Sequence, residues 1–250
     1  MHVAIYDALS FVTQMSFLLW KKISGEVTYE QAMESMVDGS YALTVISMIV
    51  SLWVFMLIGR LRKKPLNTVV GEVKYPVMVY AMAGFLAIGT RMIVAVYHYF
   101  AQGIEPLRNS IEKAAEFSPA ISTPTAALIA LLATAIIAPV FEEILFRGIV
   151  QGELMKIMRP WAAILTQGVI FGAAHGVLFQ SLFAGGVGIV LGIIYYKTND
   201  IKTAMICHGV FNYAVMLTGT VTSLVTAAVF LIFGLLITIF AMTYIIKNRN

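Results

Sequence analysis

The sequence is poor in charge and in cysteine. Only 12% of its 250 residues are Asp, Glu, Lys or Arg, whereas about a quarter is usual in soluble domains. The single cysteine, Cys207, excludes a disulfide within the chain. A lipidation motif, a long charged tail and an internal repeat are also missing. The basic residues lie in short loops and at the ends of apolar runs, which does not favour nucleic-acid binding. We therefore expect neither a soluble domain nor a nucleic-acid partner.

Apolar residues make up 60% of the chain and occur in long runs. A helix needs about 20 mostly apolar residues to cross the bilayer core, and no segment alternates as a transmembrane β-strand does. The sequence thus predicts an all-α, polytopic membrane helical bundle of about eight transmembrane helices. The runs are Val3–Trp20, Tyr41–Gly59, Pro76–Phe100, Thr125–Val150, Trp161–Leu178, Ser181–Tyr196, Thr203–Leu217 and Val221–Ile246.

We expect one transmembrane domain over residues 1–250, with N-terminal helices and external loops in 1–124, polar core helices in 125–217 and a C-terminal helix in 218–250. The basic residues cluster in 60–74, 147–159, 197–202 and 247–249. If eight helices alternate, these segments share one side of the membrane, and positive loops stay cytoplasmic. Both termini are therefore predicted to be cytoplasmic. The small size and short loops favour a bacterial cytoplasmic membrane.

Two loops, Lys21–Ser40 and Ala101–Pro124, are predicted on the other side, and Asn109–Glu116 within the second has the pattern of a short amphipathic helix.

Several polar side chains interrupt the apolar runs of the core segment. Ionisable residues inside a membrane are rare, cost about 2.5–3.5 kcal/mol each near the centre on insertion scales, and mark functional sites by default. These side chains are therefore the first candidates for a site. They are Glu142, Glu143, Arg147, Gln167, His175, His208 and Asn212.

Helical spacing separates the two adjacent glutamates. Glu143 and Arg147 are four residues apart and can pair on one face. Glu142 is rotated by about 100° from its neighbour, so it is free to face a cavity. Pro139 lacks a backbone N–H and predicts a loosened turn just before the pair. The arrangement suits a hydrolytic site, with a structural ion pair beside a reactive carboxylate.

The two histidines occur in separate apolar runs. His175 follows three small residues in "FGAAH", which allow another backbone to come near. His208 and Asn212, in "HGVFN", are four residues apart and share a face. An imidazole and a carboxamide aimed together can bind a metal or donate hydrogen bonds to an oxyanion. His98 and Arg91, in the run Pro76–Phe100, are interpreted as packing residues.

Taken together, "EEILFRG", "FGAAH" and "HGVFN" resemble the E-E-x-x-x-R, F-x-x-x-H and H-x-x-x-N signatures of the CPBP family of intramembrane proteases. This family includes the Rce-type CAAX prenyl endopeptidases and the bacterial Abi bacteriocin-processing and immunity proteins. The resemblance implies that Glu142, with His175, activates a water molecule. It implies that His208 and Asn212 stabilise the oxyanion or help to coordinate a metal. It also implies that Glu143, Arg147 and Phe171 support the site.

The resemblance also raises the question of a metal, because the family is often classed as metallopeptidase. Glu142, His175 and His208 have the side chains of a catalytic zinc site with an open position for water. The H-E-x-x-H motif of zincins is absent, and the same residues can form a metal-free glutamate–histidine pair.

Two classes of function follow from these residues. The first is an endopeptidase that cleaves a membrane-associated protein or peptide near the cytoplasmic side. The alternative is a non-catalytic membrane protein with the same polar cavity: an immunity factor, a peptide-binding factor or a transporter. A transporter is expected to show an inverted repeat, and none is visible. The sequence specifies neither the substrate nor the oligomeric state.

Overall fold

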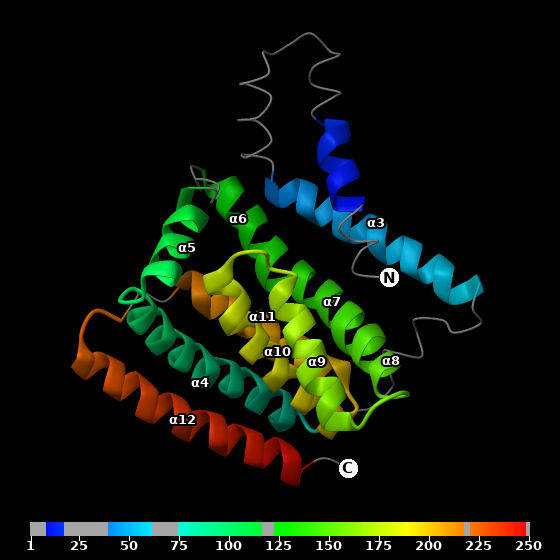
Figure 1. Ribbon diagram of the computed structural model, residues 1–250. Coiled ribbons are helices and arrows are strands. Elements are labelled where there is room, and N and C mark those ends of the chain that lie inside the picture. The colour runs from blue at the N-terminus through cyan, green and yellow to red at the C-terminus, as the bar shows by residue number, and fades with distance from the viewer. Residues whose placement is uncertain (1–8, 18–39, 62–74, 117–122, 218–220, 249–250) are drawn as a thin grey trace.

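The computed structural model describes residues 9–17, 40–61, 75–116, 123–217 and 221–248. These ranges are helical and contain no strand, which confirms the all-α prediction (Figure 1). Residues 9–17 form a helix, and the rest of the predicted first run lies outside the described residues. The further elements are α3 (Ser40–Leu61), α4 (Val77–Ala101), α5 (Glu105–Glu116), α6 (Pro124–Leu132), η2 (Ala133–Ile137), α7 (Ala138–Glu143), η3 (Ile144–Gln151), α8 (Gly152–Leu154), α9 (Pro160–Ala173), α10 (Leu178–Thr198), α11 (Ile201–Leu217) and α12 (Leu224–Lys247).

Among the described helices, four are long and apolar enough to cross a membrane: Val77–Ala101, Pro124–Leu154, Leu178–Thr198 and Leu224–Lys247. Three shorter apolar helical segments accompany them, Tyr41–Leu57, Pro160–Ala173 and Ile201–Leu217. These elements make the protein a polytopic helical membrane protein, as the apolar runs predict. The amphipathic helix expected over Asn109–Glu116 is also present as α5, and it begins earlier, at Glu105.

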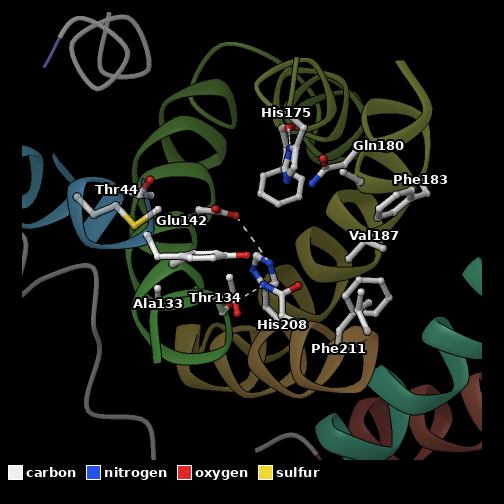
Figure 2. A pocket seen from close by; sticks show the side chains of 17 residues that line it. Thr44, Ala133, Thr134, Glu142, His175, Gln180, Phe183, Val187, His208 and Phe211 are labelled. Carbon is white, nitrogen blue, oxygen red and sulfur yellow. Dashed lines mark hydrogen bonds and ion pairs between the residues drawn. The ribbon is translucent and has the colours of Figure 1, made fainter. Parts of the chain in front are cut away.

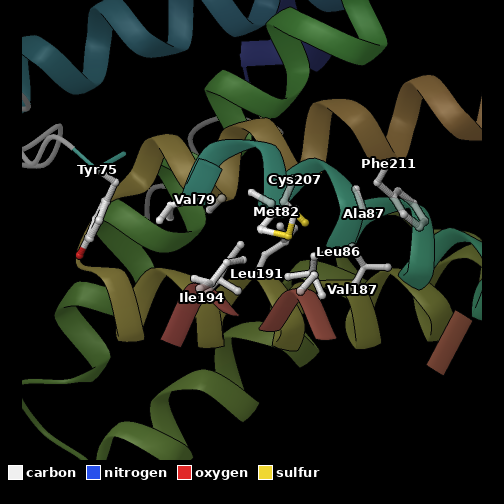
Figure 3. Packing of buried hydrophobic residues seen from close by; sticks show 14 residues of the cluster. Tyr75, Val79, Met82, Leu86, Ala87, Val187, Leu191, Ile194, Cys207 and Phe211 are labelled. Carbon is white, nitrogen blue, oxygen red and sulfur yellow. The ribbon is translucent and has the colours of Figure 1, made fainter. Parts of the chain in front are cut away.

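Two clusters of buried apolar side chains hold the bundle together. The first joins α4 to α10, α11 and α12 and includes Leu86, Leu191 and Ile245 (Figure 3). Close helix approach at Gly89 and Gly234 supports it, since a Cβ atom on Gly89 would lie 2.9 Å from the Gly234 carbonyl oxygen. The second cluster is rich in phenylalanine and lies around the polar residues of the core. Its buried phenylalanines are Phe55, Phe141, Phe146 and Phe171.

The run that contains both glutamates forms one long helical stretch with two π-helical segments, η2 and η3. Thr123 caps its first turn by accepting a hydrogen bond from the N–H of Ala126, and Pro124 occupies the first helical position. The η2 segment immediately precedes Pro139. The loosened turn expected before the glutamates is therefore confirmed, and it takes the form of a π-bulge.

The run Trp161–Leu178 is not one helix, so this boundary prediction is wrong. α9 ends at Ala173, a turn follows, and α10 begins at Leu178. Gly176 has a φ of +70°, a left-handed conformation that glycine adopts without steric cost and that ends helices. Apolar composition does not reveal this change of backbone conformation. His175 consequently lies in a tight turn rather than inside a helix.

Candidate active site

Glu143, Arg147 and His208 form a fully buried polar triad. Arg147 Nη1 donates to Glu143 Oε1 over 2.8 Å, which confirms the ion pair predicted from their spacing. His208 Nδ1 lies 2.8 Å from the same oxygen. Because Arg147 and a carboxylate form a buried pair, Glu143 is the acceptor and the His208 Nδ1–H is the donor. Glu143, at the end of α7, thus connects Arg147 on η3 to His208 on α11, and the sequence does not predict the contact with His208.

Arg147 is anchored by two further contacts. Its Nη2 donates to the carbonyl oxygen of Gly188 over 3.1 Å, and its guanidinium carbon lies 4.6 Å from the centre of the Phe171 ring, within the range of a cation–π contact. One turn further on, Gln151 Nε2 donates to the Gly192 carbonyl over 3.1 Å. The small residues of α10 therefore permit close packing and also leave carbonyl groups open to these side chains.

Phe171 is the common neighbour of the site. Its ring centre lies 4.9 Å from that of His175 and 5.7 Å from that of His208, in edge-to-face arrangements. Its side chain is buried, so its ring packs between Arg147 and the two imidazoles. This placement agrees with the supporting position expected for Phe171.

Glu142 differs from Glu143 as the helical rotation predicts. The Glu142 side chain is 20% exposed whereas that of Glu143 is fully buried. Figure 2 shows Glu142 directed into a cavity toward His208. The distance from Glu142 Oε2 to His208 Nε2 is 3.7 Å, too long for a direct hydrogen bond and suited to a bridging water molecule. Glu142 Oε2 has no hydrogen-bond partner among the described residues.

His175 is held in one tautomer by the backbone. Its Nδ1 lies 2.8 Å from the carbonyl oxygen of Phe171, and a carbonyl can only accept, so Nδ1 carries the proton. Nε2 of the neutral ring is then an acceptor. His208 has the same arrangement, with Nδ1 donating to Glu143. Both imidazoles line the cavity (Figure 2), so each can take a proton from a molecule bound there.

Asn212 reaches the π-bulge on the long helix. Within η2 the N–H of Ala138 donates to the carbonyl of Ala133, and Pro139, the next residue, has no N–H to offer the carbonyl of Thr134. Asn212 Nδ2 donates to this carbonyl over 2.8 Å. One amide hydrogen of Asn212 remains for a bound molecule. The bulge that Pro139 causes is thus tied directly to α11.

The cavity has a volume of about 400 Å³ and brings together all four residues predicted as catalytic. Sequence analysis missed four polar contributors to its walls: Tyr41 and Thr44 from α3, Thr134 and Gln180. Of these, only Thr134 had a signal in the sequence. It lies five residues before Pro139, which has no N–H to donate to the Thr134 carbonyl. The whole lining consists of Tyr41, Thr44, Met48, Ala133, Thr134, Ala138, Glu142, Phe171, His175, Gln180, Phe183, Ala184, Val187, His208, Phe211, Asn212 and Val215.

The expected ligand set for zinc does not fit this arrangement. Within the part of the chain that the structure describes, no three His, Cys, Asp or Glu side chains are grouped closely enough to hold a metal ion. The Nδ1 atoms of His175 and His208 are engaged by Phe171 and Glu143, which leaves both Nε2 atoms available. The mismatch with zinc therefore lies in the spacing of the three side chains and not in their donor atoms.

Fold and site together define an integral membrane protein with a glutamate–histidine cavity enclosed by its helices. A family model described as type II CAAX prenyl endopeptidase Rce1-like matches residues 124–214. The chain is also 27% identical over 188 residues to "Putative membrane peptidase YdiL" of Bacillus subtilis (strain 168), a match that covers 74% of each chain. No solved structure matches. The resemblance to the CPBP family of intramembrane proteases is thereby confirmed, and the matched segment contains every residue predicted for the site.

Proposed function

We propose that the protein is an intramembrane endopeptidase that hydrolyses a peptide bond of a membrane-associated protein or peptide with a water molecule activated by Glu142 and histidine. One observation carries this proposal: Glu142, a half-buried carboxylate, faces a cavity that His175 and His208 also line. A carboxylate next to two imidazoles with free Nε2 acceptors provides general-base groups on opposite sides of a reacting molecule.

In the first step, Glu142 accepts a proton from a water molecule in the cavity while the water oxygen attacks the scissile carbonyl carbon. The C=O bond becomes a C–O⁻ single bond, and its electron pair moves to the oxygen. In this mechanism His175 Nε2, whose ring lines the same cavity, accepts the second hydrogen of the water molecule and so orients it. The buried position of the site limits competing bulk water.

The developing negative charge on oxygen needs a donor. The free amide hydrogen of Asn212 supplies one, and preorganised donors of this type lower the barrier by about 3–4 kcal/mol each. His208 supplies a second donor once its Nε2 has taken a proton from a molecule bound in the cavity, because both nitrogens of an imidazolium carry hydrogen. The proton that Glu142 took then passes to the leaving amine as the C–N bond breaks.

The supporting residues keep these groups aligned. Glu143 holds His208 through Nδ1, and Arg147 holds Glu143 through its ion pair. Neither side chain is exposed, so we assign them positioning roles.

The non-catalytic alternative uses the same cavity for binding alone. It predicts that Glu142→Gln, which keeps the shape and polarity of the side chain, preserves function. The endopeptidase proposal predicts that this variant is inactive. That the substrate is a bacteriocin or a related peptide is a prediction from the family resemblance. That the protein lies in a bacterial cytoplasmic membrane is a prediction from its size and short loops.

The proposal is tested without knowledge of the substrate by comparing new protein N-termini in membranes of cells that express wild-type protein, Glu142→Gln or Glu112→Gln. Glu112 is a matched control, because it lies on α5 with its side chain 66% exposed. We expect a set of new N-termini in the wild type and in Glu112→Gln that is absent in Glu142→Gln. The same set in all three samples would contradict proteolysis by this site.

A further inference from the structure

The bundle has two ends that differ in charge. At one end, here called the basic end, α9 and α11 begin, while α8, α10 and α12 finish (Figure 1). The described basic side chains there are Lys156, Arg159, Lys197, Lys202 and Lys247.

The other end, here called the α5 end, is close to neutral as far as the described residues go. It contains α5, the turn 174–177 and the start of α6 (Figure 1). α5 carries three acidic residues (Glu105, Glu112, Glu116) and two basic ones (Arg108, Lys113). Since lysine and arginine stay on the cytoplasmic side, the basic end is cytoplasmic and the α5 end faces away from the cytoplasm.

The catalytic cavity lies in the half of the bundle near the α5 end. Thr44 comes from the first third of α3, Gln180 from the start of α10, and Asn212 and Val215 from the last turns of α11. His175 lies in the turn at that end. Val215 is 43% exposed, so the cavity wall includes a side chain at the surface of the bundle near the C-terminal end of α11.

Buried side chains close the path toward the basic end. Arg147 and Gln151 follow Glu142 along the long helix and are fully buried, and both are bonded to carbonyl groups of α10. Leu191 and Ile194 on α10 and Ile164 on α9 are fully buried at the same level. A substrate approaching from the cytoplasm would have to displace this layer.

We infer that the cavity receives its substrate from the extracytoplasmic side of the membrane, the reverse of the cytoplasmic side expected from sequence. The side chains around the cavity further restrict the substrate. They include one carboxylate, Glu142, and neither lysine nor arginine, while Met48, Phe183, Phe211 and Val215 make much of the wall apolar. The site therefore fits an apolar or basic polypeptide segment that has reached the outer half of the bilayer. That the molecule entering the cavity is a substrate rests on the proposed function. The side of the membrane from which the cavity is reached does not depend on that function.

Cysteine accessibility tests this inference. In a Cys207→Ala background, Thr44→Cys reports on the cavity, Glu112→Cys on the α5 end and Lys202→Cys on the basic end. Val215→Cys, on another wall, replaces Thr44→Cys if that variant does not fold. Each is expressed in a bacterial host and treated with a membrane-impermeant methanethiosulfonate reagent in spheroplasts or in inverted vesicles. The readout is loss of later maleimide labelling of the denatured protein.

We expect the cavity and α5-end cysteines to lose labelling in spheroplasts, and Lys202→Cys to lose it in inverted vesicles. A cavity cysteine that reacts together with Lys202→Cys, or from neither side, would overturn the inference, as would a Glu112→Cys that reacts only in inverted vesicles. Because labelling requires no cleavage, this result is independent of the test of proteolysis: an inactive protein with an externally accessible cavity would refute only the proposed function.

Discussion

His208 on α11 donates through Nδ1 to Glu143 on α7, 65 residues earlier in the chain, over 2.8 Å within the bundle. The accepting oxygen also takes the hydrogen bond from Arg147. One buried carboxylate thus fixes both a cation that holds α10 and an imidazole that faces the cavity. The neighbouring Glu142 takes no part in these contacts, so its carboxylate is available to a molecule in the cavity.

Glu143→Gln should therefore damage stability and activity together. The amide cannot balance the buried charge of Arg147, and breaking a buried ion pair in this way costs about 3–5 kcal/mol. We expect a clear fall in the midpoint of thermal unfolding in detergent and loss of cleavage. Adding Arg147→Met should recover part of the stability, because no buried charge then remains, but not the activity. If Glu143→Gln alone were as stable as the wild type, the buried contacts of Glu143 with Arg147 and His208 would be contradicted.

The ion pair and the different settings of the two glutamates could be predicted from sequence because both depend on spacing within one helix. The π-bulge could be predicted for the same reason, since Pro139 acts on its own turn. The bond between Glu143 and His208 could not, because it joins helices whose relative rotation depends on packing. Nor could the turn at His175, since an apolar run gives no sign that Gly176 will take a positive φ.

Asn212→Ala should lower thermal stability, because Asn212 ties α11 to the π-bulge at η2. It leaves the Thr134 carbonyl without its donor, and an unsatisfied buried group costs about 1–3 kcal/mol. Pro139→Ala in the same protein restores an N–H near this carbonyl. We expect the double variant to regain thermal stability while remaining inactive, because the oxyanion donor is still missing. Equal stability of Asn212→Ala and wild type would show that the bond to Thr134 is not formed.

Gly209→Ala should disturb the site from outside the cavity. A Cβ atom at this position would lie 2.6 Å from the carbonyl oxygen of Ala135, in the π-bulge, so α11 or the bulge must move. Overpacking of this kind costs about 1–3 kcal/mol, and it displaces the adjacent His208. Gly186→Ala is the matched control, since a Cβ atom there meets nothing within 4 Å. Cleavage should fall in the first variant and persist in the second; equal cleavage would contradict the close contact.

Removal of divalent metal should leave cleavage unchanged. This follows from the placement of Glu142, His175 and His208, which are not grouped as metal ligands among the described residues. The measurement is cleavage by purified protein before and after treatment with a strong chelator, with zinc added back afterwards. Activity lost on chelation and restored by zinc would contradict the metal-free mechanism while leaving the proteolytic function intact.

The most direct test of the central claim is the single-turnover rate of cleavage of one substrate, identified from the new N-termini, by wild-type protein and by Glu142→Gln. Loss of a general base typically lowers the rate by about 10²–10⁴-fold, and we predict a fall in this range with the midpoint of thermal unfolding unchanged. Glu112→Gln, the same substitution on exposed α5, should cleave at the wild-type rate. A Glu142→Gln protein that cleaves as fast as the wild type would contradict the assignment of Glu142 as the group that activates water.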